Sequence, residues 1–206
     1  MHIAIAGNIG SGKTTLTKLL AKEFNWEPAF EKTDKNPYLT SFYEDMQRWS
    51  FNVQIFFLNI RLKQIIGIQK RKKTVVQDRT IFEDAYIFAP NLHDMGLMAT
   101  RDYENYISLF NMVISFVKPP DLLIYIKAST PTLVSQIQKR GRKYESTIRL
   151  DYLNNLNDRY NDWADSYNLG KILVIDTDTI NFAEDKDDLG FVIDRINAEL
   201  FGLFKQ

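Results

Sequence analysis

The glycine-rich segment GNIGSGKT, residues 7–14, constrains the fold of this chain more than any other feature. It follows the apolar run HIAIA at residues 2–6, which predicts a strand, and it leads into residues 13–24, whose leucines recur at helical spacing. Three glycines in eight residues let the backbone adopt conformations that other residues avoid. The chain therefore begins with a strand, a sharply turning loop and a helix.

The rest of the chain continues the alternation of strand and helix. The expected strands cover residues 2–6, 26–31, 74–77, 121–127 and 171–176. The expected helices cover residues 13–24, 41–70, 80–90, 101–117, 131–140, 149–167 and 188–204. This order is typical of a parallel sheet with helices on both faces. We therefore expect an α/β fold built on a five-stranded parallel sheet.

Length and composition limit the class of protein. A chain of 206 residues that is 45% apolar suits one compact domain, residues 1–206. The net charge is zero, so no overall basic field attracts nucleic acid or a membrane surface. The basic run KRKK at residues 70–73 is interpreted as the solvated end of a helix.

The same inventory bears on location and metal chemistry. No apolar run approaches the roughly 20 residues that span a bilayer, and the N-terminus has no signal-peptide pattern. The chain has no cysteine, which excludes disulfides and fits a reducing cytoplasm, although it does not by itself exclude secretion. With only two histidines and no cysteine, a dedicated zinc site is not expected.

The glycine-rich segment matches the phosphate-binding loop GxxxxGK[ST] at every fixed position. In such loops, backbone N–H groups and the following helix N-terminus surround a phosphate. Lys13 is expected to neutralise the β- and γ-phosphates, and Thr14 to offer its hydroxyl to Mg²⁺. The expected nucleotide-binding residues are Gly7, Asn8, Ile9, Gly10, Ser11, Gly12, Lys13, Thr14 and Thr15. The motif indicates nucleoside triphosphate binding, but it does not separate ATPases, GTPases and small-molecule kinases.

Charged side chains follow two further expected strands. Asp78 and Arg79 come at the end of the strand in VVQDRT, and Glu31 comes at the end of the strand in AFEK. Open α/β sheets bind their ligands at the carboxyl ends of the strands. We therefore expect these three side chains near the bound nucleotide.

Two helical segments add polar groups to the same region. Gln54, Leu58 and Arg61 lie on one helix face because they are spaced i, i+4 and i+7. The turn KRGRK at residues 139–143 is basic and contains a glycine. A loop that presents arginines can close on a phosphate during transfer, so residues 139–147 are predicted to form a lid.

Together these motifs resemble the deoxynucleoside kinases, which transfer the γ-phosphate of ATP to the 5′-hydroxyl of a deoxynucleoside. The resemblance runs from about Ile3 to Asp178 and is closest to bacterial deoxyadenosine and deoxyguanosine kinases. It rests on the segments FEKTDKNPYLTSFYEDMQRWSFNVQIFFL, DRTIFEDAYIFAPNL, PPDLLIYIKASTPTL and KRGRKYE. It implies a P-loop kinase fold with an arginine-bearing lid, ATP and Mg²⁺ as cofactors, and a homodimer built through a helix bundle.

The resemblance also implies catalytic roles. Glu31 corresponds to the general base on the 5′-hydroxyl, since a carboxylate within hydrogen-bond reach can orient that oxygen and accept its proton. Asp78 corresponds to an acid near Mg²⁺, and Arg79 to an arginine near the 5′ oxygen. Without the resemblance, Glu31 is interpreted as a solvated acid, and Asp78 with Arg79 as a structural ion pair at a helix cap. The catalytic residues implied are Lys13, Glu31, Asp78 and Arg79.

A nucleoside pocket follows from the same resemblance. Gln54 corresponds to the glutamine that contacts the nucleobase, for which an amide supplies both donors and an acceptor. Tyr43 and Asp151 correspond to the pair that holds the 3′-hydroxyl. The substrate-binding residues implied are Glu31, Tyr43, Gln54, Phe57, Arg61, Arg79, Asp84, Phe88 and Asp151.

The base end of this pocket bears on specificity. Phe88 corresponds to an aromatic residue that stacks on the base, and Phe57 shapes the same pocket, although core packing is the ordinary interpretation of either ring. Arg61 and Asp84 correspond to an ion pair at the far end of the pocket. In relatives such a pair accompanies acceptance of deoxyadenosine, deoxyguanosine or deoxycytidine and rejection of thymidine.

The donor side of the site departs from the family pattern at one point. Arg140 and Arg142 correspond to lid arginines, but Gln136 stands where relatives often carry another arginine. Lys139 is a candidate substitute, although lysine lacks the bidentate geometry of arginine. Residues 176–182, DTDTINF, occupy the position where relatives contact the adenine of ATP.

The sequence therefore predicts ATP-dependent phosphorylation of a deoxynucleoside in nucleotide salvage, with deoxyadenosine as the first candidate. One alternative is a nucleoside monophosphate kinase of the thymidylate kinase type, which would need basic groups near the acceptor phosphate. The other is a nucleotide-dependent regulatory ATPase, which needs no nucleoside pocket.

Overall fold

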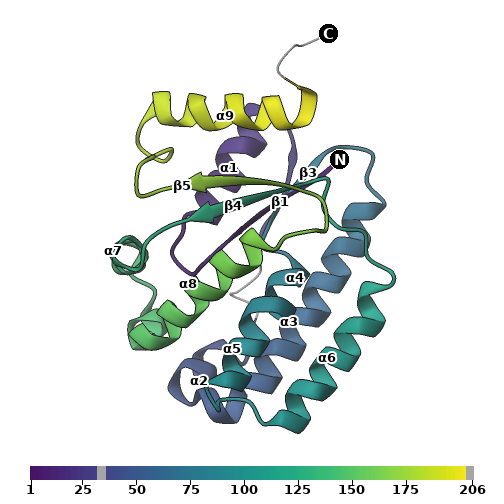
Figure 1. The fold of residues 1–206 in the computed structure, drawn as a ribbon, viewed down its shortest axis with the longest axis vertical. Coiled ribbons are helices and arrows are strands. Elements are labelled where there is room, and N and C mark those ends of the chain that lie inside the picture. The colour runs from purple at the N-terminus through teal and green to yellow at the C-terminus, as the bar shows by residue number, and fades with distance from the viewer. Residues whose placement is uncertain (32–35, 203–206) are drawn as a thin grey trace.

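The computed structural model describes residues 1–31 and 36–202. Five strands form one parallel sheet in the order β2-β3-β1-β4-β5 (Figure 1). The strands are β1 (His2–Gly7), β2 (Glu27–Ala29), β3 (Val75–Asp78), β4 (Leu122–Lys127) and β5 (Lys171–Asp176). The predicted five-stranded parallel sheet is confirmed.

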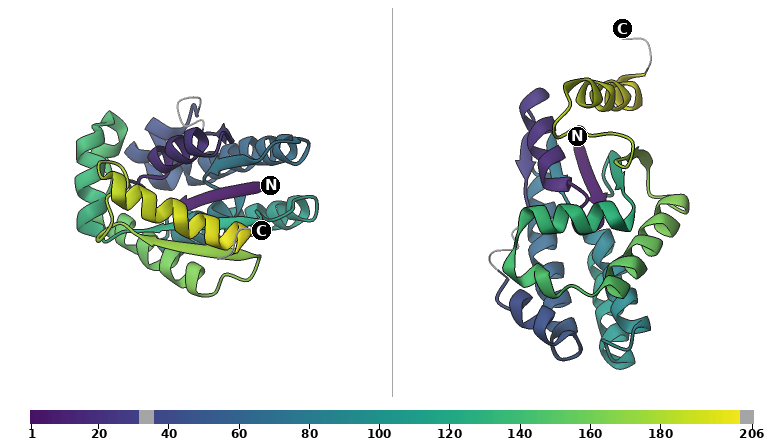
Figure 2. Two further views of the ribbon diagram at one scale, coloured as in Figure 1. Left: turned by 90° about the horizontal axis from the view of Figure 1, so that it is seen from above. Right: turned by 90° about the vertical axis from the view of Figure 1, so that its left-hand side faces the viewer.

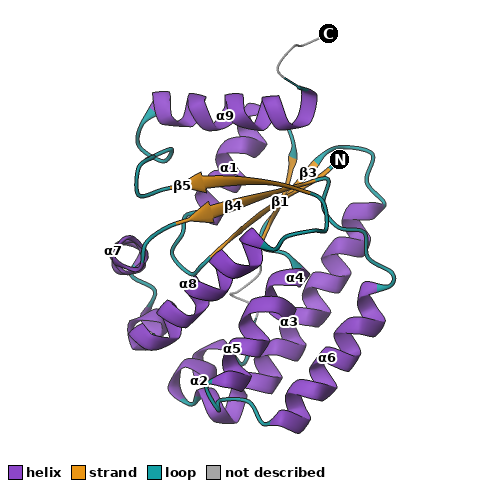
Figure 3. Ribbon diagram, in the orientation of Figure 1, coloured by secondary structure: helices purple, strands orange, loops and turns teal. Residues whose placement is uncertain are grey.

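Helices cover both faces of this sheet, as Figures 1 and 3 show. They are α1 (Lys13–Glu23), α2 (Leu39–Glu44), α3 (Met46–Gln69), α4 (Ile81–Glu83), the π-helix η2 (Asp84–Phe88), α5 (Ala89–Asp94), α6 (Thr100–Ile114), α7 (Thr130–Arg140), the 3₁₀ helix η3 (Lys143–Thr147), α8 (Leu150–Asp165) and α9 (Lys186–Phe201). The helix expected at 188–204 begins earlier than predicted, and its last two residues lie outside the described part of the chain.

The two faces of the central strand carry side chains of different size. Ile3 and Ile5 pack with α1 and α9 on one face, whereas Ala4 and Ala6 lie against α8 on the other. Side chains alternate between the faces of a strand, and the small alanines let α8 approach closely. Beyond α8, the long helices α3 and α6 extend away from the sheet (Figure 2). Of the helices in residues 1–31 and 36–202, none has the length and apolar character needed to span a membrane.

The single helix predicted at residues 41–70 is wrong, because the structure has two helices that meet at Asp45. Asp45 is extended (φ −141°, ψ 85°), and its carboxylate accepts a hydrogen bond from the backbone N of Arg48 at 3.0 Å. An aspartate in this position caps the N-terminus of a helix, so a residue read as helix interior is in fact a boundary.

The helix predicted at residues 80–90 extends further than expected and changes its winding. A capping box joins Thr80 and Glu83 at its start. It then passes through the π-helix η2 before continuing as α5. Single π turns widen a helix and recur at functional sites. Here the widened turn carries Asp84 and Phe88, and both contribute to the cavity described below.

The strand predicted at residues 26–31 is shorter than expected. β2 pairs with β3 from Glu27 to Ala29 only, so Glu31 follows the strand by two residues. Pro28 lies in the middle of β2, which is tolerated because β2 is an edge strand. The position of Glu31 is therefore not determined by the sheet.

Candidate active site

A cavity of about 610 Å³ opens at the carboxyl ends of β1, β2 and β3. Its wall is formed by the phosphate-binding loop, the segment after β2, α3, η2 and the turn after α7. Of the residues expected from the sequence, the wall includes Ile9, Gly10, Gly12, Lys13, Thr14, Thr15, Glu31, Tyr43, Gln54, Phe57, Arg61, Arg79, Asp84, Phe88, Arg140 and Arg142. Residues that are far apart in the sequence are thus brought to one site.

The phosphate-binding loop is packed tightly against α7. Gly10 has a positive φ of 87°, and a Cβ added there would lie 2.8 Å from the carbonyl oxygen of Leu133 and 2.9 Å from a side-chain carbon of Ile137. Only glycine fits that position. The helix that leads into the predicted lid therefore contacts the loop directly.

The side chain of Lys13 folds back over this loop. Its Nζ donates hydrogen bonds to the carbonyl oxygens of Gly7 at 2.9 Å and Asn8 at 2.7 Å. Burial and, after it, the charge of Arg79 lower the pKa of Lys13 to about 7. A triphosphate in the cavity would supply negative charge, which favours the ammonium form.

Thr14, in the first turn of α1, is joined to Asp78, at the end of β3, by a hydrogen bond. The Thr14 hydroxyl donates to Asp78 Oδ2 at 2.6 Å. Asp78 Oδ1 is buried and has no hydrogen-bond partner within the described residues. Burial raises the pKa of Asp78, while the charge of Lys13 opposes that rise.

These two groups fit the Mg²⁺ implied by the sequence, because magnesium takes oxygen ligands from few side chains together with phosphate and water. In residues 1–31 and 36–202 there is no cluster of three His, Cys, Asp or Glu side chains that could hold a metal. A metal bound here would therefore depend on the nucleotide for most of its ligands.

Glu31 lies between two arginines. Its Oε1 is 2.6 Å from an Nη of Arg61 and 3.4 Å from Nε of Arg79. Burial by itself raises the pKa of Glu31, but the charges of Arg79 and Arg61 outweigh it and hold the pKa at about 2. Glu31 is therefore a carboxylate across the whole physiological pH range, and the two arginines fix where its oxygens lie.

Arg79 is held in an unusual conformation. Its φ of 68° is in the left-handed region, which costs free energy for a residue with a side chain. Its guanidinium lies 4.6 Å from the ring centre of Phe88 and donates to the Tyr160 hydroxyl at 3.2 Å. The Tyr160 hydroxyl in turn donates to Glu83 at 2.8 Å. Such strain is maintained only where the surroundings over-determine it, which is the case here.

The inner end of the cavity carries a buried ion pair. Arg61 Nε donates to Asp84 Oδ2, and each residue is only 2% exposed. Burial raises the pKa of Asp84 to about 6, even though Arg61 lowers it. Gln54 is 3% exposed, and its Oε1 has no partner among the described residues. One acceptor is thus available to a ligand at this end.

One predicted residue is not in the cavity. Asp151 is 49% exposed and pairs with Arg149 on the surface, and it does not belong to the cavity wall. Glu145 belongs to the wall instead and is 5% exposed. Tyr43, also on the wall, stacks on Tyr144 with 5.9 Å between ring centres. The carboxylate brought to the side of Tyr43 is therefore Glu145, which the sequence reasoning missed although it lies within KRGRKYE.

The predicted lid residues are engaged with Glu145. Arg140 donates to Glu145 Oε2 through Nη2 at 2.7 Å and through Nε at 3.0 Å, and Arg142 donates to Oε1 at 3.4 Å. Gln136 and Lys139 also line the cavity. Lys139 pairs at 2.6 Å with Glu184, beyond β5.

The remaining predicted residues are not on the cavity wall. Gly7, Asn8, Ser11 and Asp78 are all buried. In the segment 176–182, Phe182 packs against Gly12, where an added Cβ would lie 3.3 Å from the ring. The segment expected near adenine thus contacts the phosphate-binding loop.

Comparisons with known proteins agree with this geometry. Residues 3–201 match the family model described as "Deoxynucleoside kinase". The chain is 36% identical over 196 residues to a deoxyadenosine/deoxycytidine kinase of Bacillus subtilis (strain 168), covering 94% of this chain and 90% of that protein. It is 35% identical over 208 residues to a deoxyguanosine kinase of Lactobacillus johnsonii, covering 96% of this chain and 92% of that protein.

Solved structures give the same result. A deoxyadenosine kinase from M. mycoides, with products dCMP and a flexible dCDP bound, superposes with a TM-score of 0.86 at 30% identity, covering 96% of this chain and 100% of that one. The same enzyme with bound dATP gives a TM-score of 0.85 at 30% identity, with the same coverage. The expected P-loop kinase fold is confirmed, and with it the enzyme class. The chain belongs to the deoxynucleoside kinase family.

Proposed function

We propose that the protein transfers the γ-phosphate of ATP, bound with Mg²⁺, to the 5′-hydroxyl of a purine deoxynucleoside, with deoxyadenosine as best substrate. Deoxyguanosine and deoxycytidine are further candidates, and the reaction would serve nucleotide salvage. One observation carries this proposal. Glu31 lies between the phosphate-binding loop and the inner pocket, with its carboxylate held by Arg61 and Arg79.

The phosphate end of the cavity supplies positive charge. Lys13, the backbone of the phosphate-binding loop and the lid residues Arg140 and Arg142 would surround the β- and γ-phosphates. Thr14 and Asp78 would hold Mg²⁺, which when bound neutralises charge that develops on the phosphate oxygens. The lid arginines would exchange Glu145 for phosphate when ATP is bound, so this role includes a movement.

The acceptor end supplies orientation. We propose that Glu31 accepts a hydrogen bond from the 5′-hydroxyl and takes its proton as the new P–O bond forms. Because its pKa is about 2, Glu31 is ionised when the substrate binds, so it can both aim the oxygen at phosphorus and accept its proton. Tyr43 and Glu145 would hold the 3′-hydroxyl, in place of the predicted pair with Asp151.

Base choice would depend on the inner end. The unpaired Gln54 oxygen suits the exocyclic amino group of adenine. Arg61 and Asp84 form a buried pair that cannot be broken cheaply to admit the 5-methyl group of thymidine. The names of the Bacillus and Lactobacillus relatives, which include deoxyadenosine, deoxycytidine and deoxyguanosine kinases, support the same set of candidate substrates.

The protein is proposed to act as a homodimer in the cytoplasm. Leu109 and Met112 lie on one side of α6 at i and i+3, Phe116 follows two residues after the end of that helix, and all three are exposed. Tyr86 is also exposed, and its ring centre lies 5.6 Å from that of Phe110 on α6. An apolar strip of this kind marks an interaction surface, and a helix-bundle dimer would cover it. The absence of cysteine from the chain suits a reducing compartment.

The rival activities make different demands on the acceptor end. A nucleoside monophosphate kinase needs cations available to the acceptor phosphate, whereas Arg61 and Arg79 here are both engaged with Glu31. A regulatory ATPase needs no polar pocket beyond the phosphates, whereas Gln54 and Tyr43 line one.

The test is phosphorylation of the four deoxynucleosides and their monophosphates, with ATP·Mg²⁺ and an acceptor-free control. We expect the highest kcat/KM with deoxyadenosine and the lowest with thymidine. Glu31→Gln should lose most of kcat and keep its affinity for the nucleoside, because an amide cannot accept the proton. Preferred turnover of monophosphates, or equal ATP hydrolysis without acceptor, would overturn the proposal.

Specificity is tested by combining Arg61→Met with Asp84→Ala. Removing the pair should raise the rate with thymidine relative to deoxyadenosine, whatever the loss in absolute rate. An unchanged ratio would mean that the pair does not select the base.

A further inference from the structure

A chain of hydrogen bonds, buried at His2 and Gln77 and partly buried at Gln64, runs from the N-terminus to the segment that carries Glu31. His2 Nε2 lies 2.7 Å from Gln77 Oε1, and Gln77 Nε2 donates to Gln64 Oε1 at 2.9 Å. Gln64 Nε2 then donates to the backbone carbonyl of Phe30 at 3.2 Å. The chain therefore connects β1, β3, α3 and the residue immediately before Glu31.

The pairing of the sheet makes room for this chain. Gln77 is fully buried, and its neighbours in register on the two flanking strands are Ala4 and Ala29. Two small side chains beside it leave space on this face of the sheet for an amide. A buried amide is costly unless it is hydrogen-bonded, and Gln77 is bonded at both its oxygen and its nitrogen.

The direction of the chain is set by its last member. The Phe30 carbonyl can only accept a hydrogen bond, so the nitrogen of Gln64 must face it. The oxygen of Gln64 then faces Gln77, whose nitrogen donates and whose oxygen turns to His2. This order requires a proton on His2 Nε2, and both the neutral and the charged imidazole can supply it. Each amide therefore has only one orientation that satisfies its neighbours.

Within residues 1–31 and 36–202, the sheet makes no ladder pair with the segment that carries Glu31 after Ala29. The ladder between β2 and β3 ends at Ala29. After Ala29, side chains of α3 form two hydrogen bonds to the segment, one to its backbone and one to a side chain. Gln64 binds the Phe30 carbonyl, and Arg61, one turn earlier, binds the Glu31 carboxylate.

We propose that Gln64 and Gln77 are positioning residues for Glu31. They fix the plane of the peptide between Phe30 and Glu31, and with it the direction in which the Glu31 side chain leaves the backbone. Arg61 and Arg79 then hold the end of that side chain. The inference rests on the proposed role of Glu31 as the group that orients the 5′-hydroxyl. A displacement of about 1 Å in such a group costs up to about a hundredfold in rate.

The test is Gln64→Met, which keeps the length of the side chain and removes both hydrogen bonds. We expect kcat with deoxyadenosine to fall about tenfold while KM for deoxyadenosine and ATP changes less than about twofold. The matched control is Gln69→Met, the same change at an exposed position near the end of α3, which should leave both parameters unchanged. Wild-type kcat in Gln64→Met would overturn the proposal.

A double-mutant cycle identifies the route of the effect. In a Glu31→Gln background, Gln64→Met should lower kcat by less than about twofold, because the group it positions no longer accepts a proton. An equal loss in both backgrounds would overturn the positioning role. Full activity of Glu31→Gln alone would instead show that the proposed function of Glu31 is wrong, so the two failures are distinguishable.

A second variant covers the case in which Gln64→Met does not fold. Gln64→Glu keeps the oxygen that accepts from Gln77 and loses only the donor to Phe30. It should show the same loss of kcat, whereas Gln69→Glu, which adds the same charge to the same helix, should not. Equal kcat for the two glutamate variants would overturn the proposal.

Discussion

Arg61 lies between two carboxylates, and replacing it tests whether the acceptor end works as one charge network. Arg61 contacts Glu31 at 2.6 Å and pairs with the buried Asp84. The change Arg61→Met keeps the aliphatic stem and removes the charge. Both acids then lose a cation, but the consequences differ, because Glu31 keeps Arg79 at 3.4 Å and Asp84 loses its directly bonded partner.

For Glu31 the magnitude follows from its pKa. The value of about 2, against an ordinary 4.5, corresponds to about 3 kcal/mol in favour of the charged form. Since this folded-state pKa lies below the unfolded one, that stabilisation is present above pH 4.5 and is lost as pH falls through 2. Removing one of the two arginines should raise the pKa of Glu31 by roughly one to two units.

For Asp84 the change of stability with pH has the opposite sign. Burial already raises its pKa to about 6 with Arg61 in place, so the folded protein holds this proton more tightly than the unfolded chain. A group whose pKa is raised in this way lowers the stability of the fold as pH rises from its ordinary pKa of 3.8 through the folded-state pKa. Without Arg61 the pKa rises further, and the loss continues to higher pH. The variant should therefore be destabilised more at pH 8 than at pH 5.

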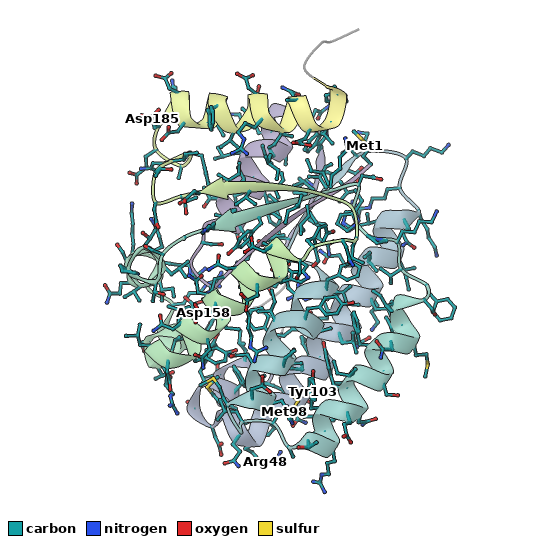
Figure 4. The ribbon with its side chains drawn as sticks, in the orientation of Figure 1. Met1, Arg48, Met98, Tyr103, Asp158 and Asp185 are labelled. Carbon is teal, nitrogen blue, oxygen red and sulfur yellow. The ribbon has the colours of Figure 1, made fainter. Side chains whose placement is uncertain are left out.

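Two measurements check this reasoning. The first is kcat/KM with deoxyadenosine as a function of pH, in which the acid limb of Arg61→Met should move upward by the shift in Glu31. The second is the melting temperature at pH 5 and pH 8. The control is Arg48→Met, the same change on the exposed start of α3, at the end of the molecule away from the sheet (Figure 4). An unmoved acid limb, together with equal destabilisation at both pH values, would refute the network.

Three further predictions concern other parts of the site. Lys13→Ala should lower kcat/KM at least about a hundredfold, ~2.7 kcal/mol, and near-normal activity in a folded variant would contradict its role at the phosphates. Glu145→Gln should raise KM for deoxyadenosine at least about fivefold, since it removes a charged hydrogen-bond acceptor, whereas Asp151→Asn should not; the reverse result would restore the assignment made from the sequence. Phe116→Lys should convert the proposed dimer to a monomer in sedimentation experiments, because it places a charge in the apolar strip formed by α6 and the turn after it; a dimer that persists would contradict the proposed interface.

Local sequence patterns were sufficient to predict much of the fold and part of the site. The strand, glycine loop and helix at the N-terminus are contiguous in the chain, so one motif predicted both the phosphate site and the first unit of the sheet. Asp78 and Arg79 were predicted in the same way, from the end of an apolar run. The parallel sheet followed from alternation of elements, which depends on connection rules rather than on individual contacts.

Errors arose where a local signal had two interpretations. Asp45 fits both a polar helix face and a helix cap, and its extended backbone conformation decides for the cap. Asp151 and Glu145 are six positions apart in one polar segment. Which of them reaches Tyr43 depends on how the 3₁₀ helix η3 turns the chain into the cavity. The sequence of that turn has no hydrophobic periodicity from which its conformation could be predicted.

What the sequence determined by itself is therefore the class of fold, the phosphate-binding loop and the residue types at the site. Only the tertiary structure decided that Arg61 joins Glu31 to Asp84 and that Glu145, and not Asp151, lines the cavity. It also decided that Gln77 and Gln64 reach the backbone before Glu31. The physical reason is that these hydrogen bonds join residues between 13 and 34 positions apart in the sequence. They lie on elements whose relative placement follows from packing of the whole core.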